Sequence, residues 1–348
     1  MPDRKSSSKK ISESRKLVKW GSSKTLIMSL PRNWTKKHNL TEQNEVQVYE
    51  NPDGSLLIMP ALQDEIDSVL SAEVDSEKYP DWETCSFVIT TKVLDGNDVI
   101  NITSKTPMTH ERNDNITSLV GGLLGFEIIS RTPQLIKIKD IMALKEASLN
   151  ELIRMVSSNV LDLIKNFIQA IEQEADETHF QSILSSRESI QRYYIRVHRQ
   201  LRKGLMQPGI LMKMEISNQD AVDFAFYIVM INDIAEYLAS MSMALIKANI
   251  GNFKILHLTT KILNITQELL TNAVSAFLFR DTKKAFDVLK SVESSKGKKR
   301  DVENKIDITI SDEASILANS GSQIILDNCE KIMESSRSIA LAALRRAL

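Results

Sequence analysis

The sequence contains few residues that form covalent or metal cross-links and few that interrupt helices. Its two cysteines, Cys85 and Cys329, are too few for a disulfide framework or a cysteine-based zinc site, and free thiols fit a reducing compartment. Only one of the eight prolines, Pro208, follows residue 146. Because proline interrupts helix interiors, the stretch 146–348 is expected to form long helices.

Long apolar runs are also missing. The longest, Phe224–Ile231, is much shorter than the roughly 20 residues of a membrane-spanning helix. No basic segment followed by an apolar one has the pattern of a secretory signal. Hydrophobic residues nevertheless make up 42% of the 348-residue chain, which is enough for packed cores in two or three domains. We therefore expect a cytoplasmic protein that is not integral to a membrane.

Motifs of catalysis are absent from the sequence. It has no glycine-rich phosphate loop, no serine nucleophile elbow and no cysteine–histidine arrangement, and its five histidines share no spacing typical of metal ligands. We expect no enzymatic activity. A metal-dependent hydrolase in the helical region would need a complete set of ligands, which the sequence does not supply.

Positive charge is concentrated at the N-terminal end. Residues 1–37 contain 11 Lys or Arg and 2 Asp or Glu, whereas the whole chain has a formal net charge of −1. Residues 1–14, rich in Ser and Lys, are expected to be a disordered basic arm. Such a charge run is often only a solvated surface, but pooled basic residues also attract the phosphates of DNA. The candidate DNA-contacting residues are Arg15, Lys16, Lys19, Lys24, Arg32, Lys36 and Lys37.

Residues 15–60 have the pattern of a small β-rich domain. A short apolar strand, Leu26–Leu30, leads into a helical turn opened by Pro31. Alternating apolar residues predict a hairpin of Val46–Tyr49 with Ser55–Met59. So short a segment rarely buries enough surface to fold alone, and we expect it to complete its core with a second copy of the chain.

Residues 61–145 are expected to form a small α+β connector domain. The segment 64–84 is acidic, with eight Asp or Glu and one Lys. The predicted elements are a helix at Asp64–Ala72, strands at Phe87–Val93 and Val99–Thr103, a helix at Thr117–Leu124, and a hairpin of Phe126–Ile129 with Leu135–Ile138.

An internal repeat organises the remainder. Asp176–Ser189 aligns with Asp281–Ser294 at an offset of 105 residues, and each copy is read as three helices. The expected helices span 148–174, 177–206, 218–249, 253–279, 282–308 and 313–347. The predicted fold is therefore mainly α, with two tandem three-helix bundles, 146–250 and 251–348, after the two small domains.

Taken together, these segments resemble a known combination of domains. Residues 15–60 resemble the SpoVT-AbrB family of swapped-hairpin DNA-binding domains, and residues 146–348 resemble the PhoU family, the tandem helical bundles of phosphate-uptake regulators. Leu119–Ile141 is similar to the connector by which archaeal proteins fuse the two. The residues that carry the first resemblance are Arg15, Gly21, Leu30-Pro31, Trp34–Lys37, Val46–Tyr49 and Leu56–Met59.

The resemblance implies an archaeal transcriptional regulator of phosphate uptake. Its head would be a homodimer that binds operator DNA, and its bundles would receive a signal. By position, Arg15 fills the basic place before the glycine loop and Lys36 the one at the end of the proline-initiated helix, while Thr35 stands where the family often has another Arg. The alternative is an adaptor that docks on a phosphate transporter or a sensor kinase and uses the head only to dimerise.

The resemblance also implies carboxylate motifs that hold a divalent or ferric cation on the bundles. The motif is eroded here: Asn232–Glu236 and Glu330–Glu334 lie on the third helices, and the middle helices lack the expected Asp. The segment Glu303–Asp307 also matches the motif but is set aside. Asp307 is expected about one helical turn from the chain reversal near residue 311, whereas Glu330 is expected on the order of 28 Å beyond that reversal. The alternative to a metal is solvated carboxylates beside apolar stripes. The candidate ligands are Glu188, Glu236, Glu293, Glu330 and Glu334.

Overall fold

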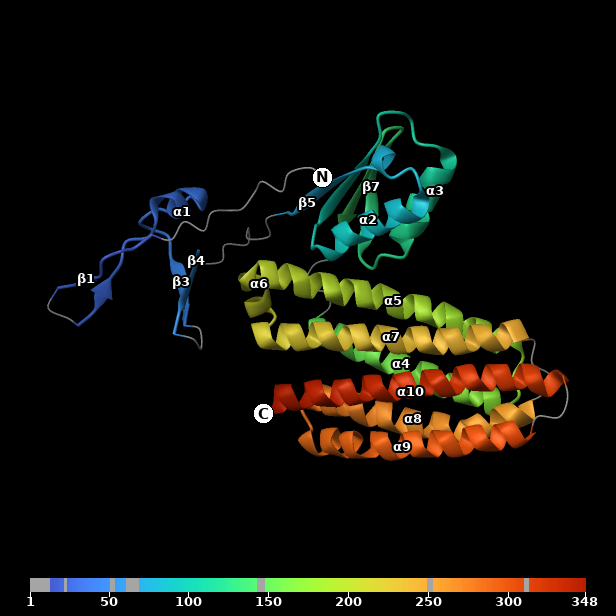
Figure 1. Cartoon of the computed structure of the whole chain (residues 1–348). Helices are drawn as coiled ribbons and strands as arrows, with labels where there is room; N and C mark the ends of the chain where they lie inside the picture. The colour runs from blue at the N-terminus through green and yellow to red at the C-terminus, as the bar shows by residue number, and fades with distance from the viewer. Residues whose placement is uncertain are drawn as a thin grey trace. The chain divides into compact units, whose positions relative to one another are not determined.

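The computed structural model describes two compact units, Met1–Ser68 and Val69–Leu348 (Figure 1). The described residues are 13–21, 24–50, 54–60, 69–142, 148–248, 253–309 and 313–348. Most of them are helical, which confirms the mainly α fold class. The expected basic arm falls almost entirely outside the described residues.

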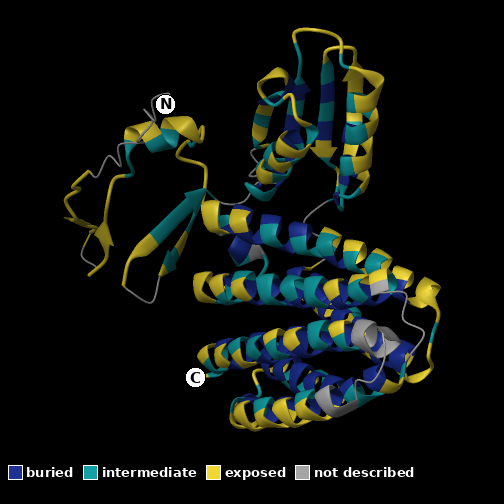
Figure 2. Ribbon diagram, turned by 45° about the vertical axis from the view of Figure 1, so that its right-hand side comes forward, coloured by how far each residue is buried: buried dark blue, intermediate teal, exposed yellow. Residues whose placement is uncertain are grey.

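The first unit consists of two short hairpins and a short helix. Its elements are β1 (Val18–Lys19), β2 (Leu26–Ile27), α1 (Arg32–Lys37), β3 (Val46–Glu50) and β4 (Leu56–Pro60). β1 pairs with β2, and β3 pairs with β4, both antiparallel, so the predicted second hairpin is confirmed. None of the unit's described residues is buried, and Figure 2 accordingly draws them in yellow and teal. One copy of the unit thus has no closed core among its described residues.

The second unit begins with a four-stranded sheet that carries two helices. Its strands lie in the order β5, β6, β8, β7, with β5 parallel to β6 and the other pairs antiparallel. The bounds are β5 (Ser71–Asp75), η1 (Ser76–Lys78), α2 (Trp82–Leu94), β6 (Val99–Thr103), α3 (His110–Gly121), β7 (Phe126–Thr132) and β8 (Leu135–Asp140). Alternate strand residues such as Ile100, Ile102 and Ile138 join one buried cluster with Ile89 of α2 and Ile116 of α3.

Three predictions in this region need correction. Phe87–Val93 was predicted to be a strand, but it lies within α2. The run of β-branched residues suggested a strand, whereas Cys85, Ile89 and Val93 form a buried stripe at a spacing of four, and Asp81 caps the helix through the N–H groups of Glu83 and Thr84.

The other two corrections concern helix bounds. Ser71 and Ala72 lie in β5 rather than in a helix, and the rest of the predicted helix Asp64–Ala72 lies mostly outside the described residues. The helix predicted at Thr117–Leu124 begins earlier, at His110, because the Thr109 side chain caps it. The strand Val99–Thr103 and the hairpin of β7 with β8 are confirmed.

The helical region follows the sequence prediction closely. Its helices are α4 (Leu149–Glu172), α5 (Glu177–Met206), α7 (Asn218–Ala248), α8 (Phe253–Phe279), α9 (Thr282–Thr309) and α10 (Glu313–Ala347). A short additional helix, α6 (Pro208–Lys213), begins at the proline. α5, α7, α10 and α9 lie side by side in that order, with α4 and α8 behind them (Figure 1).

The repeat is visible in how its helices begin. Asp176 caps α5 by accepting a hydrogen bond from the Thr178 N–H, and Asp281 caps α9 by accepting one from the Lys284 N–H. The two caps are the residues that the repeat aligned. The two copies join through contacts of α4 with α8 and of α7 with α10, and their buried residues form one continuous cluster.

One described helix is long and apolar enough to span a bilayer by length and composition alone. It is α7, between Asn218 and Lys247, and half of its most apolar window is buried within the protein. A core helix of a bundle has the same properties, because it is surrounded by other helices.

Gly125 tests the packing of the sheet on the helical region. Its φ is +88°, and an added Cβ would lie 2.8 Å from Met142 Cβ and 3.1 Å from Arg196 Nη1. We expect Gly125→Ala to lower the free energy of unfolding by about 1–2 kcal/mol or more, since both backbone and space oppose a side chain. Urea denaturation measures it.

The matched control is Gly121→Ala, because Gly121 is helical and its added Cβ meets nothing within 4 Å. It should leave stability unchanged or raise it by up to about 1 kcal/mol. Equal effects of the two substitutions would contradict the packing described here.

Candidate nucleic-acid interface and the charged clusters of the helical unit

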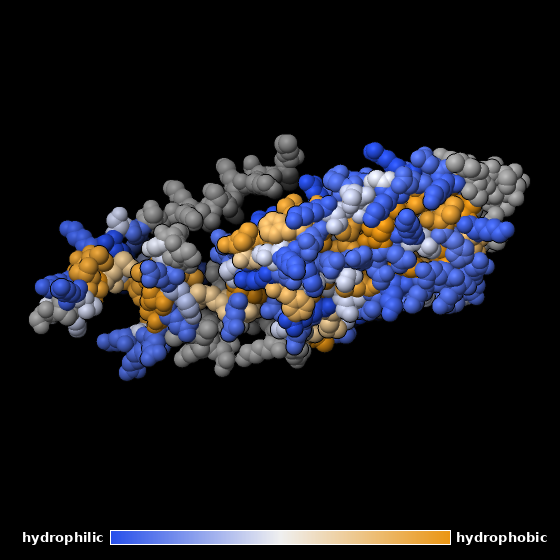
Figure 3. Space-filling view, turned by 90° about the horizontal axis from the view of Figure 1, so that it is seen from below, coloured by the Kyte–Doolittle hydropathy of each residue, from blue (hydrophilic) through white to orange (hydrophobic). Residues whose placement is uncertain are grey.

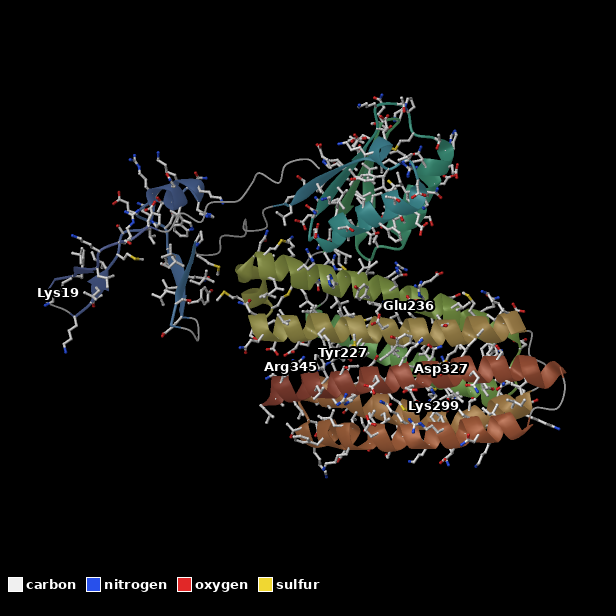
Figure 4. The ribbon with its side chains drawn as sticks, viewed as in Figure 1. Lys19, Tyr227, Glu236, Lys299, Asp327 and Arg345 are labelled. Atoms are coloured by element: carbon white, nitrogen blue, oxygen red, sulfur yellow. The ribbon has the colours of Figure 1, made fainter. Side chains whose placement is uncertain are left out.

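All seven candidate DNA-contacting residues are exposed and lie in the first unit. Arg32, Lys36 and Lys37 belong to α1, where the two lysines occupy the last turn. Lys19 lies in the β1–β2 hairpin (Figure 4). Only Arg15, which pairs with Glu13, makes a salt bridge within the described part of the chain. The unit therefore presents basic side chains to solvent from both its hairpin and its helix.

The same unit also exposes large apolar side chains. Trp20 is 65% and Leu56 is 62% exposed. In Figure 3, hydrophobic surface in orange lies beside hydrophilic surface in blue in this unit. The other large apolar residues exposed here are Leu17, Val18, Leu26, Ile27, Met28 and Val48. Exposed apolar side chains in this number are unusual for a closed domain and mark a candidate binding surface.

Thr35 stands where the resemblance places a further Arg. Its hydroxyl donates a hydrogen bond to the Arg32 carbonyl oxygen, 3.0 Å away. The side chain is therefore engaged with its own helix, and positive charge on α1 comes from its neighbours.

In the helical unit, the candidate metal ligands on the third helices are paired with basic side chains. Glu236 of α7 accepts from Arg187 Nε of α5 at 2.8 Å, and Arg187 also donates to Gln191. Glu334 of α10 lies 2.5 Å from Lys296 Nζ of α9. Gln191 and Lys296 are separated by the repeat offset of 105 residues. Each repeat thus places a base of its middle helix against the Glu of its third helix.

Lys299 contacts three further carboxylates of α9 and α10. Its Nζ lies 2.7 Å from Glu330 Oε2 and 3.1 Å from Asp327 Oδ1 of α10, and 3.4 Å from Glu303 Oε1 of α9. Figure 4 shows Lys299 and Asp327 on these adjacent helices. Burial alone would lower the pKa of Lys299, but the hydrogen bonds and charges of these carboxylates raise it above its ordinary value.

The first residue of the Glu303–Asp307 match belongs to this group of charges. Glu303 and Glu330 contact the same ammonium group. Lys299 lies nearer the middle of α9 than Asp307 does, and its long side chain bridges the two helices. Glu303, four residues after Lys299 on the same face of α9, therefore meets the ammonium group that Glu330 also contacts.

The candidate ligands do not converge on one point. Glu188 and Glu293 are exposed, and Glu293 lies 3.5 Å from Lys296. Among the residues that the structure describes, no three His, Cys, Asp or Glu side chains are grouped so as to hold a metal ion. Because basic side chains already pair with four of these carboxylates, the side chains as they stand do not fit a divalent or ferric cation.

A buried cluster of charges, which the sequence reading missed, joins the sheet to α5. Arg196 and Arg199 are each only 1% exposed. Arg196 Nη1 lies 2.7 Å and Arg199 Nη1 2.9 Å from Asp140 Oδ2, at the end of β8. Arg199 Nη2 and Lys203 Nζ lie 2.6 and 2.7 Å from Asp98 Oδ1, just before β6. We call these five residues the clamp.

Backbone groups complete the clamp. Arg196 donates to the Met142 carbonyl oxygen at 3.0 Å, and Arg199 donates to that of Asn97 at 3.1 Å. Asp98 also accepts from the Leu70 N–H at 2.9 Å. Burial alone would raise the pKa of Asp98, but the hydrogen bonds of Lys203 and Leu70 and the nearby positive charges lower it. The carboxylate is therefore kept ionised.

Only part of the clamp has a sequence signal. Arg196, Arg199 and Lys203 recur at spacings of three and four, which places them on one face of a helix. Asp98 and Asp140 lie far from them in the chain, and nothing local in the sequence connects the two groups. A basic stripe at helical spacing was the available clue.

Comparison with known proteins gives one structural match. The chain matches no protein-family model, and no curated protein matches it in sequence. The crystal structure of the phosphate transport system regulatory protein PhoU from Streptococcus pneumoniae aligns with 56% of this chain and 91% of that chain, at 14% sequence identity and a TM-score of 0.46. A likeness of this size does not establish a function for this chain.

The clamp predicts a pH-dependent contribution of Asp98 to stability. Because its pKa is lower in the folded than in the unfolded protein, the contribution is present above the unfolded pKa and is lost as pH falls through the folded pKa. Asp98→Asn should lower the free energy of unfolding near pH 7 by about 3 kcal/mol, since it leaves the buried Lys203 without a carboxylate and Arg199 with Asp140 alone. The loss should shrink in acid. Urea denaturation across a pH series measures both effects.

Asp95→Asn is the matched control, because Asp95 is 35% exposed and pairs with Arg202, itself 51% exposed. It should cost less than about 1 kcal/mol. If Asp98→Asn cost no more than this control, the clamp would not have the role described.

Lys299 yields a prediction about metal binding. Lys299→Met removes the ammonium from three carboxylates and should create affinity for a divalent cation. Mn²⁺ should then raise the thermal midpoint of the variant. It should not raise that of the native protein or of Lys290→Met, which removes an exposed lysine from the same helix. Equal stabilisation of all three proteins would show that Lys299 does not act as the counterion.

Proposed function

We propose that the protein is a homodimeric DNA-binding regulator of transcription that responds to phosphate status. The observation that carries the proposal is the surface of the first unit, where seven basic residues and many apolar side chains are exposed together and no described residue is buried. Basic side chains suit the phosphates of DNA, and unburied apolar side chains suit a second copy of the same unit.

The phosphate part of the proposal rests on the resemblance of residues 146–348 to the PhoU family. Two tandem three-helix bundles are the architecture which that resemblance implies, and α4–α10 have it. The order of segments, with a β-rich head before a connector and two bundles, is the order of the archaeal fusion. In the proposed protein the bundles receive the signal and the head acts on DNA.

The clamp supports a role of the sheet in coupling. Because buried ion pairs join β6 and β8 to α5, the sheet and the first bundle are expected to move as one body. The chain then continues from the sheet to the head through residues 61–68. A change in the position of α5 would thus act on the segment that leads to the DNA-binding head.

A second candidate function is the adaptor, in which the bundles dock on a phosphate transporter or sensor kinase. The observation that favours it is a groove of about 980 Å³ between α7 and α10. Val222 and Leu341 are exposed in this groove, with Leu344 and Leu348 beside them. Exposed apolar side chains in a groove between helices are typical of surfaces that bind another protein.

A gel-shift experiment with the full chain and the promoter of a phosphate-transport operon distinguishes the two functions. The regulator should shift this DNA at physiological salt. Lys36→Ala combined with Lys37→Ala should weaken binding and lower the slope of log affinity against log salt by about 1.8, since each phosphate contact contributes about 0.9. Lys283→Ala combined with Lys290→Ala removes the same charge from exposed positions of α9 and should change neither quantity.

Failure of the native protein to shift the DNA, together with co-purification of transporter subunits, would identify the adaptor instead. Light scattering of the same preparation gives the mass of the assembly. A monomer with an intact first unit would contradict the dimeric head.

A further inference from the structure

A cleft in the sheet domain has the features of a binding site for a small anion. It has a volume of about 490 Å³ and lies where the parallel strands β5 and β6 end and where α2 and α3 begin. In open sheets, ligands often bind at the carboxyl ends of parallel strands. The residues that matter here are Glu77, Ser104, Thr106, Glu111, Arg112 and Trp82.

The loop after β6 forms a pocket for one negatively charged oxygen. Glu77 Oε1 accepts hydrogen bonds from the N–H groups of Lys105 and Thr106 at 2.8 and 2.9 Å. The hydroxyls of Ser104 and Thr106 donate to the same oxygen at 3.1 and 3.2 Å. Successive backbone N–H groups that point at one place form an anion-binding nest. We call residues 104–106 the nest.

The nest stabilises the charged form of the side chain that fills it. The hydrogen bond from the Thr106 N–H, followed by the other donors of the nest, lowers the pKa of Glu77. Glu77 is itself an exposed residue, so its carboxylate can turn into water without crossing packed side chains. The Glu77 carboxylate can therefore leave the nest when another anion binds there.

Arg112 supplies a positive charge to the same cleft. Its Nη2 donates to the carbonyl oxygens of Tyr79 and Pro80 at 3.1 and 2.8 Å, which fixes the guanidinium in position. Its Nη1 is buried and has no hydrogen-bond acceptor among the described residues. The guanidinium carbon lies 5.8 Å from the centre of the Trp82 ring. A fixed guanidinium that lines the cleft favours an anionic ligand there through its positive charge.

We propose that this cleft binds a small oxyanion and that Glu77 occupies the nest in its absence. The ligand replaces the Glu77 carboxylate at the nest and engages Arg112 with a second oxygen. Because Glu111 also lines the cleft, binding by exchange is favoured over binding that adds negative charge beside Glu77. The ligands that fit this description carry a carboxylate or phosphate group with at least two acceptor oxygens.

The position of the cleft suggests how its occupancy reaches the helical bundle. The nest follows Thr103 at one end of β6, and Asp98 of the clamp precedes the other end. The inference rests on the proposed function only for its biological role, as the effector site of the regulator. Binding itself is a property of the second unit and is measured without DNA.

The test is calorimetric titration of the full chain with inorganic phosphate, glycerol 3-phosphate and malonate in separate experiments at constant ionic strength. Glu77→Ala removes the competing carboxylate and should bind at least one of these anions about tenfold or more tightly than the native protein. The anion whose affinity rises most shows whether the cleft prefers free phosphate, a phosphate ester or a carboxylate. Arg112→Gln in the Glu77→Ala background should lose the gain.

Glu83→Ala is the matched control, because Glu83 is an exposed acid of α2 that does not line the cleft. It should bind as the native protein does. Glu77→Gln, a neutral and weaker occupant of the nest, provides a second variant and should also bind more tightly. If neither Glu77 variant binds any of the three anions more tightly than Glu83→Ala, the proposal is overturned, whatever the gel-shift experiment gives.

Discussion

The second unit depends on charges that are buried between its sheet and its first bundle. Asp98 and Asp140 pair with three bases on one face of α5, and the two arginines are almost fully excluded from water. Bringing such groups out of water is unfavourable, and only close pairing with further hydrogen bonds offsets it. The clamp therefore adds less to net stability than its short distances suggest. It does make other arrangements of the sheet on α5 unfavourable, because they would leave a buried charge unpaired.

Two glycines allow the sheet domain to lie close enough to α5 for these ion pairs to form. An added Cβ at Gly96 would lie 3.1 Å from Lys203 Cβ, and one at Gly125 would lie against Arg196 and Met142. Both glycines have φ near +90°, which other residues rarely adopt. The backbone turns before β6 and before β7 can thus come within reach of α5. The sheet domain and the helical bundle form one compact unit for this reason.

The charges of the bundle follow a related principle. Where the resemblance implies carboxylates around a metal, this chain places Arg187, Lys296 and Lys299 among them. A tethered ammonium group offsets part of the negative charge of the acids without a ligand from solution, and it also links α9 to α10. Both repeats pair a middle-helix base with a third-helix acid, although the two bases, Arg187 and Lys296, do not align at the offset of 105 residues. The first unit differs from the sheet domain and from the helical bundles, since its apolar side chains remain exposed in one copy of the chain.

The sequence by itself determined the helices of the bundle to within a few residues, their order and their duplication. Each helix has its own apolar stripe, and α5 and α9 begin at aligned caps, so the information is local. It did not determine α2, where a run of β-branched residues suggested a strand although the buried residues recur at a helical spacing of four. Only the tertiary structure decided which charges meet. Asp98 and Arg199 lie about a hundred residues apart, and Glu303 reaches Glu330 through Lys299. A charge carries no local mark of its partner, because that pairing is set by how helices and strands pack.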